Sequence, residues 1–323
     1  MTSEYRLTLR KHYGRLGLAL LAYYVVTAAA QFACQYAALA WAPQWTEAGW
    51  FAPALAFVPM YLIGFPIFLW LLPKAPPREL LPEKRKVPGR ELLPIFLMCL
   101  GVLYPGNLLG QGLDWLLRRV FHSAGVTNAL EGMLDSSGNW PFLLVAVVLA
   151  PIMEELTFRK LLLDRMRTVD KPSALIFTAL AFALFHSNVV QFFYAFGVGV
   201  IFGCIYLRTG RIVYSMVLHV LINFLGSAAV LFLMGDLDLG NLDAAALVEN
   251  MLPLLGLGVY AMTLLAGSVA GIVLLIRRRR SLRVADGGEL LRPGDRFQLV
   301  FCRLGWLLYC LAALAMTLIS YLL

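Results

Sequence analysis

Residues 211–234 read RIVYSMVLHVLINFLGSAAVLFLM, a stretch whose only charged residue, Arg211, stands at its first position. The residues that follow are predominantly apolar over the length of about 20 residues that an α-helix needs to cross a bilayer. Lipid cannot pair with backbone N–H and C=O groups, so such a segment must be helical. The stretch therefore predicts a transmembrane helix, with the polar side chains of His219 and Asn223 inside it.

Apolar stretches of this kind recur along the whole chain. The 323 residues are 60% apolar and only 14% charged, whereas a soluble domain carries about a quarter charged residues. We therefore predict an all-α fold, a polytopic transmembrane helical bundle of about eight to nine spans. The spans are expected near residues 16–42, 50–73, 93–117, 141–160, 172–187, 190–207, 211–234, 251–276 and 297–323.

Several of these spans have special features. The third is interrupted by Pro-Gly-Asn at 105–107, which predicts a kink or a break. The fifth, 172–187, is short and is expected to span the bilayer or to lie partly in its interface. The sixth holds Gly199 and Gly203, a GxxxG pair that favours close helix packing. The cysteines lie in apolar spans without CxxC spacing, so we interpret them as packing residues: Cys34, Cys99, Cys204, Cys302 and Cys310.

The basic residues predict the orientation in the membrane. With a cytoplasmic N-terminus and nine spans, 24 of the 27 Lys and Arg residues fall on the inner side, as the positive-inside rule requires. The loop that holds Asp236, Asp238, Asp243 and Glu249 falls outside. Residues 1–15 are polar and basic, and the apolar run after them is too long for a cleavable signal peptide. The net charge of +8 is thus explained by the lipid bilayer, and no nucleic-acid partner is expected.

Ionisable side chains at membrane depth are few, and such residues are costly and usually functional. Glu154 and Glu155 end the fourth span in PIMEELTFR, His186 ends the fifth in FALFH, and His219 lies within the seventh. Asn223 follows His219 by four residues, so the two share one helix face. All of these residues fall in spans four to seven, which predicts a site formed by the four central helices.

The two neighbouring glutamates are expected to differ in role. Glu155 and Arg159 stand at i and i+4 in the favourable order for an ion pair. Glu154 lies about 100° around the helix from Glu155, so one carboxylate pairs with the arginine while the other faces a cavity.

These residue types suit hydrolysis by water. A carboxylate in a low-dielectric pocket holds a proton more strongly than in water and becomes a better general base. A histidine is able to hold the water or to protonate the leaving amine, and an Asn amide with a second histidine is able to stabilise an oxyanion. No serine or cysteine stands beside these histidines as an evident nucleophile, which favours attack by water.

A metal site is the alternative. Two histidines and one glutamate form a ligand set for catalytic zinc, here Glu154, His186 and His219. No HExxH motif is present and the three residues lie on three helices. The sequence requires no cofactor, and a divalent metal such as zinc stays open.

Three motifs in this region resemble one known family. EExxxR appears as Glu154, Glu155 and Arg159, FxxxH as Phe182 and His186, and HxxxN as His219 and Asn223. Each motif is weak alone, but their order on successive apolar helices, about 32 residues apart, resembles the CAAX prenyl protease and bacteriocin-processing (CPBP, or Abi) family of intramembrane proteases. The resemblance covers roughly residues 141–228.

The resemblance implies a role for each motif residue. Glu154 would activate water together with His186, and His219 with Asn223 would form the oxyanion site. Glu155 and Arg159 would order the helix and the pocket, with Phe182 in support. It also implies three parts of the chain: N-terminal transmembrane helices and a basic cytoplasmic loop in 1–140, a catalytic core in 141–228, and C-terminal transmembrane helices in 229–323.

The function expected from these observations is an intramembrane endopeptidase that cleaves membrane-associated peptides or proteins, lipidated or not. We expect a multi-pass protein of a prokaryotic plasma membrane, with its site in the cytoplasmic half of the bilayer and a cavity that admits water. Two other functions fit buried Glu and His residues: a proton-coupled transporter, and a non-catalytic immunity or scaffold protein. The internal repeats common in transporters are not evident.

Overall fold

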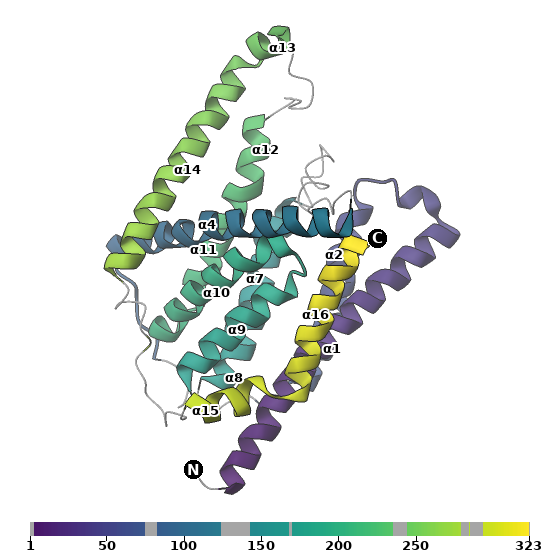
Figure 1. The fold of residues 1–323 in the computed structure, drawn as a ribbon, viewed down its shortest axis with the longest axis vertical. Coiled ribbons are helices and arrows are strands. Elements are labelled where there is room, and N and C mark those ends of the chain that lie inside the picture. The colour runs from purple at the N-terminus through teal and green to yellow at the C-terminus, as the bar shows by residue number, and fades with distance from the viewer. Residues whose placement is uncertain are drawn as a thin grey trace.

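The computed structural model describes residues 3–74, 83–123, 143–167, 170–234, 244–278, 284 and 293–322, and every regular element in them is helical (Figure 1). The predicted all-α bundle is therefore confirmed. Asp236, Asp238 and Asp243, which the sequence predicts to lie in an outer loop, are outside the described residues.

The elements follow in this order: α1 (Ser3–Trp41), η1 (Pro43–Trp45), α2 (Phe51–Pro59), η2 (Met60–Gly64), α3 (Phe65–Leu71), α4 (Gly89–Phe121), η4 (Val145–Leu149), α7 (Ala150–Glu155), η5 (Leu156–Leu163), α8 (Asp164–Met166), α9 (Lys171–Phe185), α10 (Val189–Thr209), α11 (Val213–Asn223), η6 (Phe224–Ala228), α12 (Ala229–Met234), α13 (Ala244–Glu249), α14 (Met251–Arg277), α15 (Pro293–Arg296), η8 (Phe297–Phe301) and α16 (Leu304–Leu322). Of these, η1 is a 3-10 turn, and the other η elements are π-helical segments within longer helices or beside them.

Seven helices in the described part of the chain are long and apolar enough to cross a membrane. The other two expected spans differ from them for physical reasons. The fifth is α9, which at 15 residues is shorter than a span needs. The fourth is the run from η4 to α8, which carries charged side chains such as Glu154 and Arg159 within it.

Two sequence-based details need correction. The third span is one continuous helix, α4, through Pro94 and Pro105, so the predicted break is wrong. The glycine beside Pro105 serves packing instead, because a Cβ on Gly106 would lie 2.7 Å from the Cα of Tyr194 in α10. The last span begins at Leu304 rather than at 297, and Cys302 therefore lies between η8 and α16, where it is exposed.

Helices from both ends of the chain pack against the central helices. Tyr13 and Leu20 of α1, Phe177 of α9 and Trp306 of α16 belong to one buried cluster, and the rings of Phe177 and Trp306 lie 4.0 Å apart. A Cβ on Gly17 would lie 2.4 Å from the backbone nitrogen of Trp306, which explains the glycine at this helix crossing.

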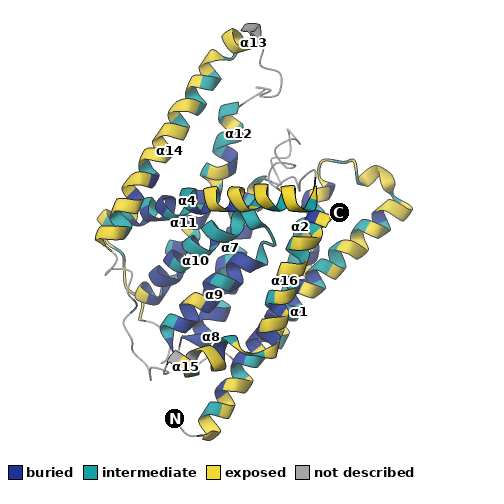
Figure 2. Ribbon diagram, in the orientation of Figure 1, coloured by how far each residue is buried: buried dark blue, intermediate teal, exposed yellow. Residues whose placement is uncertain are grey.

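Burial is greatest in the middle of the bundle. Figure 2 shows α9 and the neighbouring helices largely buried, whereas α14 is exposed along most of its length. Its exposed side chains include Leu252, Val259 and Met262, which suits a helix whose outer face meets lipid. The GxxxG prediction is confirmed, because Cβ atoms on Gly199 and Gly203 would lie 3.3 Å from Ala179 and 2.4 Å from Leu175 of α9.

Candidate active site

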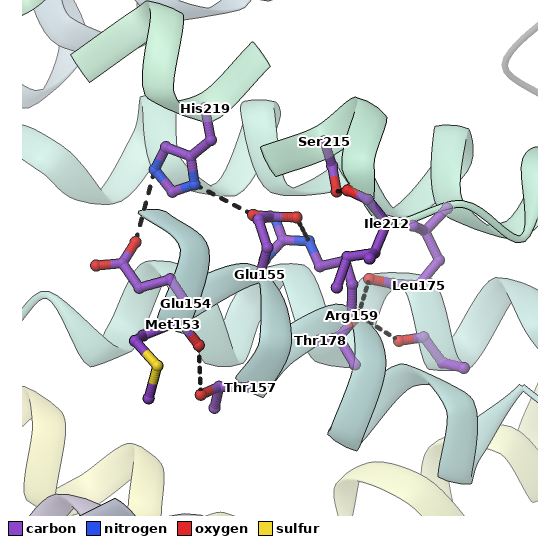
Figure 3. Close-up of polar contacts among 11 residues, drawn as sticks. Met153, Glu154, Glu155, Thr157, Arg159, Leu175, Thr178, Ile212, Ser215 and His219 are labelled. Carbon is purple, nitrogen blue, oxygen red and sulfur yellow. Dashed lines mark hydrogen bonds and ion pairs between the residues drawn. The ribbon is translucent and has the colours of Figure 1, made fainter. Parts of the chain in front are cut away.

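The two glutamates stand where α7 passes into the π-helical segment η5. Glu155 is completely buried, whereas the side chain of Glu154 keeps 21% of its surface exposed. Their side chains leave the helix in different directions, and His219 reaches toward both (Figure 3). The two carboxylates therefore occupy different environments, as the sequence predicts.

Glu155 is the carboxylate that pairs with Arg159. Its Oε2 lies 3.2 Å from the arginine Nε, and both side chains are at most 1% exposed. The guanidinium carbon lies 4.6 Å from the centre of the Phe182 ring and 5.5 Å from that of Phe202. The arginine is thus sandwiched among aromatic faces in a favourable cation–π arrangement, and it neutralises a charge that would be costly alone.

His219 lies between the two glutamates. Its Nδ1 is 3.2 Å from Oε1 of Glu155, and its Nε2 is 3.6 Å from Oε2 of Glu154. Because Glu155 is held as a carboxylate by Arg159, it accepts a hydrogen bond, which assigns a proton to Nδ1. The sequence motifs group His219 with Asn223 and give no sign of this bridge to both glutamates.

Asn223 lies one turn beyond His219 on α11, at the point where the π-helical segment η6 begins. Its Nδ2 donates to the backbone carbonyl of Ala146, at 3.2 Å. An amide nitrogen has two hydrogens, so one N–H remains for a substrate after this bond has fixed the side chain.

His186 is held at the end of α9. Its Nδ1 donates to the carbonyl of Phe182, at 2.8 Å, because a carbonyl is only an acceptor. Ser187 follows with a left-handed φ of 47° and hydrogen-bonds the Tyr24 hydroxyl of α1. Asn188 then caps α10 by accepting from the N–H of Val190, at 2.9 Å. This strained turn fixes the position of the imidazole.

A cavity of about 330 Å³ brings the predicted residues together. Glu154, His186, His219 and Asn223 all line it, although they come from α7, the end of α9, and α11. Phe182 also lines the cavity, whereas Glu155 and Arg159 lie behind its wall.

Other lining residues were missed by the sequence motifs. Phe57 comes from α2, Leu103 and Asn107 come from α4, and Gln191 and Tyr194 come from α10. Polar side chains in apolar spans are a usable signal for Asn107 and Gln191. Phe57 reaches the cavity from α2, far along the chain from the motif helices, so no local pattern indicates it.

The geometry does not fit the alternative metal site. Within the described residues, no group of three or more His, Cys, Asp and Glu side chains is arranged to hold a metal ion. Glu154, His186 and His219 line the same cavity but do not form such a group.

Comparison with known proteins gives one match. Residues 136–225 match a family model described as type II CAAX prenyl endopeptidase Rce1-like. No curated protein and no solved structure matches the chain significantly. The matched segment contains the EExxxR, FxxxH and HxxxN motifs and every element that carries them.

Proposed function

We propose that the chain is an endopeptidase that hydrolyses peptide bonds within the membrane by activated water. The match of residues 136–225 to the family model of type II CAAX prenyl endopeptidases supports the proposal. One observation carries the proposal: the cavity collects Glu154, His186, His219 and Asn223 on helices of a membrane bundle. The neighbouring ion pair of Glu155 and Arg159 leaves Glu154 as the carboxylate open to the cavity.

Glu154 and His186 are suited to hold the attacking water. The Glu154 carboxylate accepts hydrogen bonds, and His186, whose Nδ1 donates to the Phe182 carbonyl, has Nε2 left to contact a water. Both groups line the cavity, so a water between them donates to each. Such a water is oriented for attack on a carbonyl carbon, and Glu154 is the general base that takes its proton.

His219 and Asn223 are suited to stabilise the oxyanion. With a proton on Nδ1, His219 is a donor to the substrate only when Nε2 is protonated as well. The free N–H of Asn223 adds a second donor, and its bond to Ala146 fixes it beforehand.

Hydrolysis then proceeds through a tetrahedral intermediate. The water oxygen bonds to the carbonyl carbon, one water proton passes to Glu154, and the carbonyl oxygen becomes an oxyanion beside His219 and Asn223. The oxyanion re-forms the carbonyl as the C–N bond breaks, and Glu154 returns its proton to the leaving amine. The remaining water proton leaves with the new carboxyl group, and the base is restored.

The substrate is a membrane-associated peptide or protein. Much of the cavity wall is apolar, with Phe57, Leu103 and Phe182 among its side chains, which suits a segment that arrives from the lipid phase. We place the N-terminus and the basic loops on the cytoplasmic side of a prokaryotic plasma membrane, and the site in the cytoplasmic half of the bilayer.

Purified protein in liposomes tests the proposal with two probes: a farnesylated peptide that ends in a CAAX sequence, and an unlipidated peptide fused to one transmembrane helix. The wild type cleaves at least one probe, and His186→Ala does not. Cleavage of neither probe, or cleavage that survives in His186→Ala, overturns the proposal. Uptake of a solute driven by a pH gradient, without cleavage, would identify the transporter instead.

A further inference from the structure

Two carboxamide side chains lie in the cavity wall outside the three motifs. Asn107 comes from the middle of α4 and Gln191 from the first turn of α10, and both line the cavity that Glu154 and His186 also line. Asn107 precedes the segment matched by the family. Polar side chains within apolar spans are usually functional, and the hydrolysis described above uses neither of these two. Their presence in the wall therefore needs an explanation of its own.

Close packing of α4 on α10 brings the two carboxamides to the same part of the wall. A Cβ on Gly106 would lie 2.7 Å from the backbone of Tyr194, and a Cβ on Gly110 would lie 2.4 Å from the carbonyl oxygen of Val190. Asn107 stands between the two glycines on α4, and the glutamine stands between their two partners on α10. Because the two backbones touch on either side, both carboxamides extend from a tightly packed helix pair.

The hydrogen bonds of the two side chains leave several groups open to the cavity. The Nε2 of Gln111 donates to the Oδ1 of Asn107, at 2.6 Å, and the Nδ2 of Asn107 makes no hydrogen bond to any described residue. Gln191 makes a capping bond from its backbone N–H to Asn188, whereas its side chain has no partner in the described part of the chain. Asn107 thus presents two N–H donors, and Gln191 presents both donors and an acceptor.

A substrate segment needs such partners when it enters the cavity. In a helix the peptide groups bond to one another, and the turns of the helix shield the carbonyl carbons from an attacking water. Cleavage therefore requires an extended segment, whose N–H and C=O groups have lost their helical partners. Lipid offers them none, and a desolvated peptide group without a partner is costly. The cavity wall has to supply the missing hydrogen bonds.

We infer that Asn107 and Gln191 form a subsite that binds the backbone of an extended substrate beside the peptide bond that is cleaved. Asn107 donates to a substrate carbonyl, and Gln191 accepts from a substrate N–H through its Oε1. Because both contacts are made with the peptide backbone, the subsite imposes an extended conformation rather than a sequence. The inference rests on the proposed function and adds substrate-binding residues from α4 and α10.

Asn107→Leu and Gln191→Leu test the subsite, because leucine keeps much of the volume and removes the hydrogen-bonding groups. For the probe that the wild type cleaves, we expect KM to rise about threefold to tenfold in each variant, as the loss of one hydrogen bond implies. The value of kcat should change less than about twofold, because the contact is made equally before and during the reaction. Gln44→Leu is the matched control, since Gln44 is an exposed carboxamide in η1 that does not line the cavity.

Binding without turnover tests the contact atom by atom. In versions of the two liposome probes, one backbone amide at a time is replaced by an ester, which lacks the N–H. Their Kd is measured with His186→Ala as the parent. An ester at one position should raise Kd about fivefold. In the variant that also carries Gln191→Leu, the same ester should raise Kd less than about twofold, because the acceptor for that N–H is gone.

A wild-type KM in both leucine variants would overturn the inference, as would an equal rise of KM in Gln44→Leu. Ester effects that are the same with and without Gln191 would overturn it too. The proposed function fails separately. If the wild type cleaves no probe, the endopeptidase proposal fails and the ester series still decides the subsite; if the wild type cleaves and both leucine variants keep its KM, the subsite alone fails.

Discussion

The buried ion pair between Glu155 and Arg159 should contribute much more to the free energy of unfolding than an exposed ion pair does. Both side chains are at most 1% exposed, so Arg159→Met leaves the Glu155 carboxylate buried without its counter-charge, which costs about 3–5 kcal/mol. Loss of the contacts with the Phe182 and Phe202 rings adds about 0.5–2 kcal/mol. Replacing both partners together, as in Glu155→Gln with Arg159→Met, should recover part of this loss because no charge stays buried.

The assay is the free energy of unfolding in detergent micelles, measured for the two single variants and the double variant as a cycle. A coupling of roughly 2 kcal/mol or more is expected, since the two residues are in direct contact. Arg118→Met is the matched control. Arg118 forms the same i, i+4 contact with Asp114, but its side chain is 34% exposed, so its loss should cost less than about 1 kcal/mol. Equal costs for Arg159→Met and Arg118→Met would show that burial does not set the contribution of the ion pair.

Three further changes test the oxyanion donor, the crossing of α4 and α10, and the need for a metal. Asn223→Ala removes one oxyanion donor and should lower kcat for the cleaved probe by a factor of about 10²–10³, with a small change in KM. A change confined to KM would contradict the role of Asn223 as an oxyanion donor. Gly106→Leu should destabilise the protein by about 1–3 kcal/mol through overpacking, because a Cβ at this position would lie 2.7 Å from Tyr194. Gly112→Leu is the control, since a Cβ there would meet no atom within 4 Å. Equal melting temperatures of the two variants would contradict the close packing at Gly106. Treatment with EDTA or 1,10-phenanthroline should leave cleavage intact, because no three-ligand group is found among the described residues. A loss of cleavage that zinc reverses would contradict this expectation.

The sequence predicts the helical bundle well because lipid leaves a spanning segment few alternatives. It also predicts the pairing of Glu155 with Arg159, since that contact is local to one helix. It does not predict the continuous α4, because glycines at tight crossings with α10 and α14 matter more than the helix-breaking tendency of Pro105. These close approaches depend on tertiary packing, which no local pattern encodes.

The candidate site, like the fold, is only partly predictable from the sequence. The motif residues are found from the sequence because ionisable side chains are rare in apolar spans. The position of His219 between two glutamates depends on how α11 packs on α7. The contribution of Phe57 depends on α2, far away along the chain from the motif residues. Its apolar and aromatic surroundings resemble ordinary lipid-facing sequence, so only the three-dimensional arrangement identifies it.

The role of Glu154 as the general base is tested by the single-turnover rate of probe cleavage by Glu154→Gln relative to the wild type, at equal melting temperature. Glutamine keeps the size of the side chain but is not a base, so the account predicts that the rate falls by at least about 10²–10⁴. A Glu154→Gln variant that cleaves at the wild-type rate would contradict the account.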